Sequence, residues 1–97
     1  MKIRILMTVT GRVQGVSFRK HTARMAGELG VNGWVTNLSD GSVRGCFEGD
    51  AAAVEALLTW CSAGPERARV DFLTCEVHPY TGEYRGFRIL QDEARAA

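Results

Sequence analysis

Residues 11–19 read Gly-Arg-Val-Gln-Gly-Val-Ser-Phe-Arg, and this stretch sets the expected fold. It follows residues 2–10, where apolar and polar side chains alternate as they do in a half-buried strand. It leads into an amphipathic run that begins at Phe18. The pattern predicts a strand, a glycine-bearing loop and a helix in direct succession. Such a loop points backbone N–H groups and the positive end of a helix dipole at one place, which favours an anion site.

Arg19 lies in the first turn of the predicted helix, where the dipole disfavours a cation unless a negative group is beside it. Arginine matches the oxygens of a phosphate group with paired hydrogen bonds. Gly15 permits a positive φ, and no proline removes an amide from the loop, so a concave run of donors can hold a tetrahedral oxyanion. The alternative is a plain strand-to-helix connection that needs glycines for its turn. Arg19 favours the anion site.

The rest of the chain predicts further elements with clear boundaries. They are a strand over 31–37, a turn at Asp40-Gly41, a strand over 42–48, a helix over 51–61, a strand over 68–77 and a short strand over 87–90. The order is βαββαβ plus a short C-terminal strand. With right-handed crossovers it predicts an α+β fold of the ferredoxin-like, split βαβ type, with two helices on one face of an antiparallel sheet.

Length and composition place limits on the class of protein. The 97 residues predict one domain over 1–97, with a core over 5–90 and a tail over 91–97 that frays because it has no apolar face. The net charge of +1 gives no general attraction to nucleic acid. No apolar run is long enough to span a membrane, and the first residues do not resemble a signal peptide. The three cysteines, odd in number and widely spaced, predict small core residues in a reducing cytoplasm.

The residues of the chain exclude several kinds of phosphate chemistry. The loop lacks the Lys-Ser/Thr pair of a nucleotide-binding loop, and no cysteine nucleophile lies near Val13. His21 and His78 are isolated, and no ligand spacing suggests a metal or cofactor. A phosphoryl transfer without these aids needs a leaving group that departs without a proton, as a carboxylate does. The protein then has to hold the phosphoryl group, neutralise its charge and place a water in line.

Asn37 is a candidate for orienting that water. It ends the second predicted strand, which can reach the same corner of the fold as the loop, and its amide offers both a donor and an acceptor. The pattern alone favours another role, an Asx-turn residue beside the hairpin.

These residues resemble the acylphosphatase family. The match covers residues 5–90 and lies in residues 11–19, Gly33-Trp-Val-Thr-Asn37, Asp40-Gly41-Ser42-Val43, Gly64-Pro65 with Ala68 and Val70, and Gly86-Phe87-Arg88-Ile89. Leu90 departs from the family, which commonly has a tyrosine near this position. Related loops occur in a larger hydrogenase-maturation protein, typically with proline after the arginine. Lys20 stands there in this chain, which favours a free-standing enzyme.

The resemblance implies a small enzyme that hydrolyses the carboxyl–phosphate bond of acyl phosphates, with no metal or cofactor. The products are a carboxylate and inorganic phosphate. By position in the motif, Arg19 would bind the phosphate and Asn37 would orient the attacking water. The phosphate-binding loop would comprise Gln14, Gly15, Val16, Ser17, Phe18 and Arg19.

The alternative is a ferredoxin-like nucleic-acid-binding or regulatory module without hydrolase activity. Arg85-Gly86-Phe87 resembles the start of an RNA-recognition motif, but Arg88-Ile89 departs from it and the segment lies on the final strand. The chain also lacks a basic stripe. We therefore expect a cytoplasmic monomer that acts on a small acyl phosphate and has no nucleic-acid or membrane partner.

Overall fold

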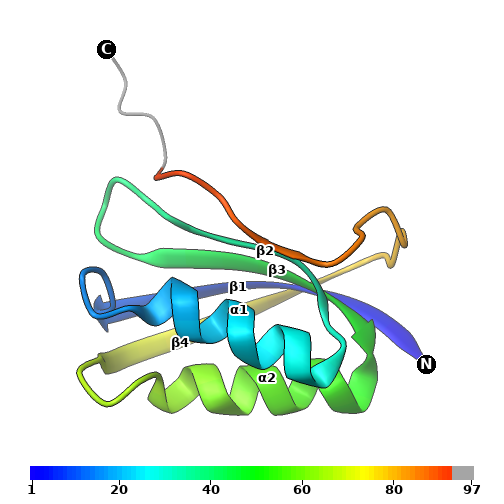
Figure 1. Cartoon of the computed structure of the whole chain (residues 1–97), viewed down its shortest axis with the longest axis horizontal. Helices are drawn as coiled ribbons and strands as arrows, with labels where there is room; N and C mark the ends of the chain where they lie inside the picture. Colours follow the sequence, from blue (N-terminus) through cyan, green and yellow to red (C-terminus); the bar gives the residue numbers. More distant parts are fainter. Residues whose placement is uncertain (93–97) are drawn as a thin grey trace.

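A computed structural model describes residues 1–92 as two helices packed on one face of a five-stranded sheet (Figure 1). The order of the strands in the sheet is β4-β1-β3-β2-β5. In chain order the elements are β1 (Lys2–Arg12), α1 (Phe18–Leu29), β2 (Asn32–Asn37), β3 (Val43–Asp50), α2 (Ala51–Ala63), β4 (Arg69–His78) and β5 (Phe87–Ile89).

The pairing of the strands confirms the ferredoxin-like fold class. β1 lies between β3 and β4 and is antiparallel to both, and β2 is antiparallel to β3. β5 adds a parallel pair with β2, with Phe87 opposite Gly33, so the complete sheet is mixed. The reason is the connection from β4 to β5. Residues 79–86 cross from one edge of the sheet to the other, and β5 therefore enters in the direction of β2.

The core lies between the sheet and the helices. The alternate residues Ile5, Met7 and Val9 of β1 are buried, as the period-two pattern predicts. The ring of Phe18, at the start of α1, packs against Trp60 of α2 with centroids 5.7 Å apart. Full burial of a side chain such as Phe18, which is 2% exposed, contributes about 1.5–3 kcal/mol. This packing holds the N-terminal end of α1 next to the end of β1.

Close backbone approach at Gly11 bends β1 just before the loop. The pairing of β1 with β4 shifts register between Thr10 and Gly11, where Gly11 has a φ of 123°. A Cβ atom on Gly11 would lie 2.2 Å from the carbonyl oxygen of Arg69. Only glycine fits there without moving backbone, so the bulge is specified by the sequence.

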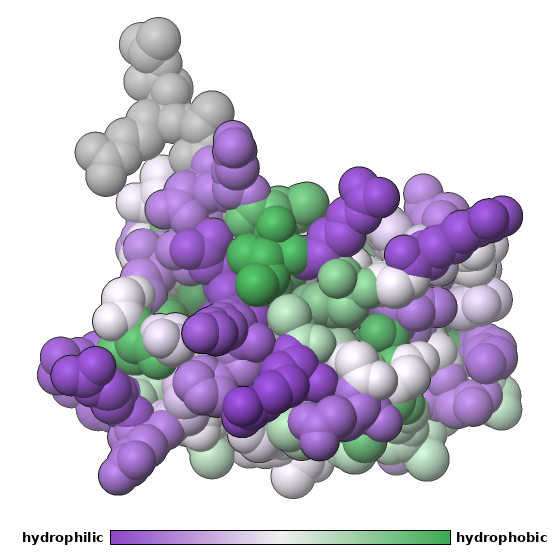
Figure 2. Space-filling model, in the orientation of Figure 1, coloured by the Kyte–Doolittle hydropathy of each residue, from purple (hydrophilic) through white to green (hydrophobic). Residues whose placement is uncertain are grey.

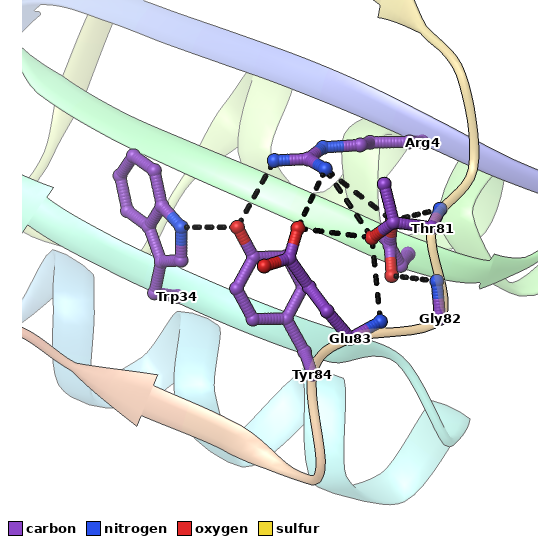
Figure 3. Close-up of polar contacts among 7 residues, drawn as sticks. Arg4, Trp34, Thr81, Gly82, Glu83 and Tyr84 are labelled. Carbon is purple, nitrogen blue, oxygen red and sulfur yellow. Dashed lines mark hydrogen bonds and ion pairs between the residues drawn. The ribbon is translucent and has the colours of Figure 1, made fainter.

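A buried carboxylate anchors the connection before β5. Glu48 is 1% exposed, and its side chain accepts hydrogen bonds from the Thr81 N–H (2.9 Å), the Thr81 hydroxyl (3.0 Å) and the Gly82 N–H (3.1 Å). Arg4 lies beside it and donates to Glu83 (3.0 Å) and to the Tyr84 hydroxyl (3.0 Å), as Figure 3 shows. We call these six residues, Arg4, Glu48 and residues 81–84, the Glu48 cluster. It fixes the path of the chain into β5.

The surface is ordinary for a small domain. On the face seen in Figure 2, hydrophobic residues form small patches between hydrophilic ones. No helix within residues 1–92 has the length and apolar character needed to cross a membrane. Cys46 and Cys61 are buried as predicted, and burial raises the pKa of the Cys61 thiol to about 12. The prediction is wrong for Cys75, which is exposed because no residue of the edge strand β4 is fully buried.

Candidate active site

The loop between β1 and α1 has an unusual backbone. Gly15 has a φ of 74° and Ser17 a φ of 63°, and Ser17 is the one residue other than glycine with a positive φ among residues 1–92. A non-glycine residue in the left-handed region costs about 1–2 kcal/mol. Left-handed residues within a loop turn successive N–H groups toward one side, as in anion-binding backbone nests. The loop therefore keeps a shape that suits an anion despite its cost.

The amides at the start of α1 are available to a ligand. Ser17 occupies the N-cap position, but its side chain makes no capping hydrogen bond. Within residues 1–92, no protein acceptor takes a hydrogen bond from the amides of residues 14–18. Uncapped amides and the helix dipole together attract negative charge.

Arg19 and Asn37 converge on a single oxygen atom. The Oδ1 atom of Asp92 lies 2.9 Å from Nη1 of Arg19 and 3.2 Å from Nδ2 of Asn37. Arg19 also donates to the carbonyl of Leu90 (3.1 Å). The anion that the helix start requires beside Arg19 is therefore supplied by the protein itself, and its oxygen marks a point that both side chains reach.

A cavity of about 360 Å³ opens at this place. It brings the loop, the first turn of α1, the end of β2 and β5 together. Its lining residues are Val13, Gly15, Ser17, Phe18, Arg19, Lys20, Asn37 and Ile89. Asn37 is 7% exposed, so its amide is held by the strand end around it.

The structure brings five of the seven predicted site residues to this cavity. Gln14 and Val16 do not line it. Val16 is buried in the core, and the side chain of Gln14 turns toward the β2–β3 connection. Both contribute to the loop through their backbone, which is the part that the sequence motif requires.

The pattern favoured an Asx turn at Asn37, and the structure has an Asx turn in the connection that follows β2. That turn is made by Asp40, whose Oδ1 accepts hydrogen bonds from the hydroxyl and the N–H (2.9 Å) of Ser42. Both hydrogen bonds lower the pKa of the Asp40 carboxyl, and the bond from the Ser42 hydroxyl has the larger effect. The side-chain amide of Asn37 donates to Asp92 (3.2 Å), and Asn37 lines the cavity.

Sequence reasoning missed Lys20, Ile89 and Asp92 at the site. Lys20 follows the motif directly and was visible as a neighbouring cation. Ile89 and Asp92 come from the far end of the chain, in segments with no motif of their own. Leu90 donates its N–H to Val35 O (2.9 Å), and Gln91 O accepts from the Thr36 hydroxyl (2.7 Å), so β2 carries this segment to the cavity. Residues 93–97 of the predicted tail lie outside the described residues.

The part of the chain that is described offers no clustered metal ligands. Among residues 1–92, no group of three or more His, Cys, Asp or Glu side chains is arranged to hold a metal ion. His21, the histidine nearest the loop, has its Nδ1 atom 2.8 Å from the carbonyl oxygen of Ser17. It therefore contacts the backbone of the loop.

The chain is similar to known proteins over most of its length. The acylphosphatase family model matches residues 5–89. An acylphosphatase from Geobacter sulfurreducens is 54% identical over 89 residues, which cover 92% of this chain and 98% of that one. An acylphosphatase from Methylococcus capsulatus is 51% identical over 92% of this chain and 97% of its own length.

A solved structure supports the same conclusion. An acylphosphatase from Coxiella burnetii has a TM-score of 0.87 and 36% identity, covering 92% of this chain and 93% of its own. These matches define a small ferredoxin-like phosphohydrolase family. The chain belongs to the acylphosphatase family.

Proposed function

We propose that this protein hydrolyses acyl phosphates to a carboxylate and inorganic phosphate. The observation that carries the proposal is the convergence of Arg19 and Asn37 on one oxygen atom, at the uncapped start of α1. Membership of the acylphosphatase family supports the same substrate class.

The first step is exchange of one anion for another. The Asp92 carboxylate is 66% exposed, so its pairing with Arg19 contributes little and is readily replaced. A phosphoryl group in its place binds Arg19 through two oxygens and accepts hydrogen bonds from the loop amides of residues 14–18. Its charge is neutralised where charge develops in the transition state.

The second step is attack by water in line with the leaving carboxylate. The Asn37 amide accepts a hydrogen bond from the water through Oδ1 and contacts a phosphoryl oxygen through Nδ2. The water oxygen bonds to phosphorus, and the bond from phosphorus to the carboxylate oxygen breaks with its electron pair. The two protons of the water leave with the phosphate. A carboxylate departs without protonation, so this chemistry needs no paired general acid.

The proposal also covers the domain organisation, oligomeric state, location and partners of the enzyme. We propose that residues 1–97 act as one domain and as a monomer in the cytoplasm, with no metal, nucleic-acid or membrane partner. The small net charge of +1 and the lack of clustered metal ligands among residues 1–92 agree with this view.

The nucleic-acid-binding alternative is disfavoured by the position of Phe87. A base-stacking module needs this aromatic ring on an open sheet surface. Here the ring packs against Phe47, with centroids 5.8 Å apart, and belongs to the edge of the core. It is therefore not free to stack on a base.

Release of phosphate from benzoyl phosphate and acetyl phosphate, in the presence of a chelator, tests the activity. We expect turnover of both compounds and no turnover of phenyl phosphate, whose leaving group is poorer. Activity lost on chelation, or equal activity on the monoester, would contradict the proposal.

A further inference from the structure

The side chain of Gln14 joins the two halves of the site. Its Nε2 atom donates to the carbonyl oxygens of Leu38 (2.8 Å) and Ser42 (2.9 Å). These two hydrogen bonds link the phosphate-binding loop directly to the connection between β2 and β3. The motif position of Gln14 predicted a backbone role, whereas its side chain forms this separate bridge.

The two acceptors mark the two ends of the turn after β2. The Leu38 N–H donates to Ser42 O (2.9 Å), and the Gly41 N–H donates to Leu38 O (3.2 Å). Asp40 braces the same turn through Ser42, which is buried. Both protons of the Gln14 side-chain amide are thus donated to a turn that has hydrogen bonds of its own.

This geometry places Asn37 at a set distance from the loop. Asn37 directly precedes Leu38, so the bridge at Leu38 O acts one residue from the amide that we assign to water. We propose that Gln14 is a positioning residue, which holds Asn37 in register with the phosphate-binding loop. The inference rests on the proposed function, and it assigns a role to the Gln14 side chain that backbone binding of phosphate does not require.

The expected effect follows from the sensitivity of in-line attack to geometry. Misplacement of reacting groups by about 1 Å can cost roughly 10²-fold in rate. Phosphate affinity depends instead on Arg19 and the loop amides, whose positions do not require the hydrogen bonds from Gln14 to Leu38 and Ser42. Loss of the bridge should therefore lower kcat and leave binding nearly unchanged.

Gln14→Met removes the two donors and keeps the length of the side chain. We expect kcat on benzoyl phosphate to fall about 10- to 100-fold, with KM and the Kd for inorganic phosphate changed by less than about threefold. Combined with Asn37→Ala, the same substitution should cost less than about twofold, because it acts through Asn37.

Asn32→Ala is the matched control. Asn32 lies at the opposite end of β2, and its Oδ1 accepts a hydrogen bond from the Gly86 N–H (3.2 Å). This variant also loses an amide that ties β2 to a neighbouring segment, and we expect its kcat to stay within about twofold of wild type.

The inference would be overturned if Gln14→Met lowered kcat by the same factor in the wild-type protein and in the Asn37→Ala variant. It would also be overturned if Gln14→Met weakened phosphate binding and left kcat unchanged. Thermal unfolding shows whether each variant folds. If Gln14→Met does not fold, Gln14→Glu replaces it, because the glutamate side chain has the same shape with acceptors in place of the donors. Its kcat is then measured with and without Asn37→Ala in the same way. A wild-type protein that does not hydrolyse benzoyl phosphate would instead refute the proposed function.

Discussion

Arg4 and Arg19 occupy two contrasting environments in one small domain. The Arg4 side chain is 19% exposed and contacts Glu48, Glu83 and Tyr84 on the open face of the sheet (Figure 3). The Arg19 side chain is 28% exposed and contacts one carboxylate, that of Asp92, and one carbonyl. The two arginines therefore differ less in burial than in their partners.

The difference lies in how easily each set of partners can be replaced. Glu48 is buried and also holds two backbone N–H groups, so removing it from Arg4 would leave several polar groups unsatisfied. Asp92 is exposed and follows the last strand, and water can replace Arg19 as its partner. Arg4 is accordingly part of the framework, whereas Arg19 is available to a ligand.

Arg19→Ala should have the largest effect on activity. It removes the cation that we propose neutralises the phosphoryl group, and we expect kcat/KM on benzoyl phosphate to fall by about 10³-fold, since one preorganised group contributes about 10²–10³. Isothermal titration should show inorganic phosphate binding lost. Arg24→Ala removes an exposed cation from the same helix and should leave both measurements unchanged. Retained phosphate binding in Arg19→Ala would contradict the role of Arg19.

Asn37→Ala should separate turnover from binding. We expect kcat to fall about 10²–10³-fold, because the attacking water would lose the group that we propose orients it. The Kd for inorganic phosphate, measured by titration, should change only a few fold, since Arg19 and the loop amides remain. A variant with full turnover would exclude the water-orienting role.

Glu48→Gln should affect stability and leave the chemistry intact. It removes the charge opposite Arg4 and weakens the bonds from Thr81 and Gly82, and we expect the free energy of unfolding in urea to fall by about 2–3 kcal/mol. The comparison variant is Asp71→Asn, which breaks an exposed pair with Arg69 (3.0 Å) and should cost less than about 0.5 kcal/mol. Equal losses in the two variants would show that burial does not distinguish these pairs.

Asp92→Asn should have the smallest effect on activity, and it should improve substrate binding where Arg19→Ala weakens it. An exposed ion pair is worth about 0.2–1 kcal/mol, so removing this competitor should lower KM by up to about fivefold with kcat unchanged. Asp50→Asn, which breaks the distant pair with Lys2 (3.2 Å), should leave KM as it is. A raised KM in Asp92→Asn would mean that Asp92 assists substrate binding.

Much of the fold was accessible from the sequence because its signals are local. The alternation in β1 and the glycines around the loop report backbone geometry directly, and the family resemblance predicted Arg19 and Asn37 together as site residues. The contributions of Gln14 and Asp92 were not accessible in this way. Each depends on a contact between segments more than 20 residues apart in the sequence, as does the burial of Glu48 beneath Thr81 and Gly82. Side-chain partners of this kind are set by tertiary packing, which no local pattern records.

Hydrolysis of acetyl phosphate in water enriched in ¹⁸O tests the central claim most directly. If Asn37 directs a water to the phosphorus held by Arg19, the bond between phosphorus and oxygen breaks. Mass spectrometry should then find the enzyme-dependent label in inorganic phosphate and none in acetate, after subtraction of the uncatalysed reaction. Label in the acetate would mean attack at the carbonyl carbon, and it would contradict the assignment of the site.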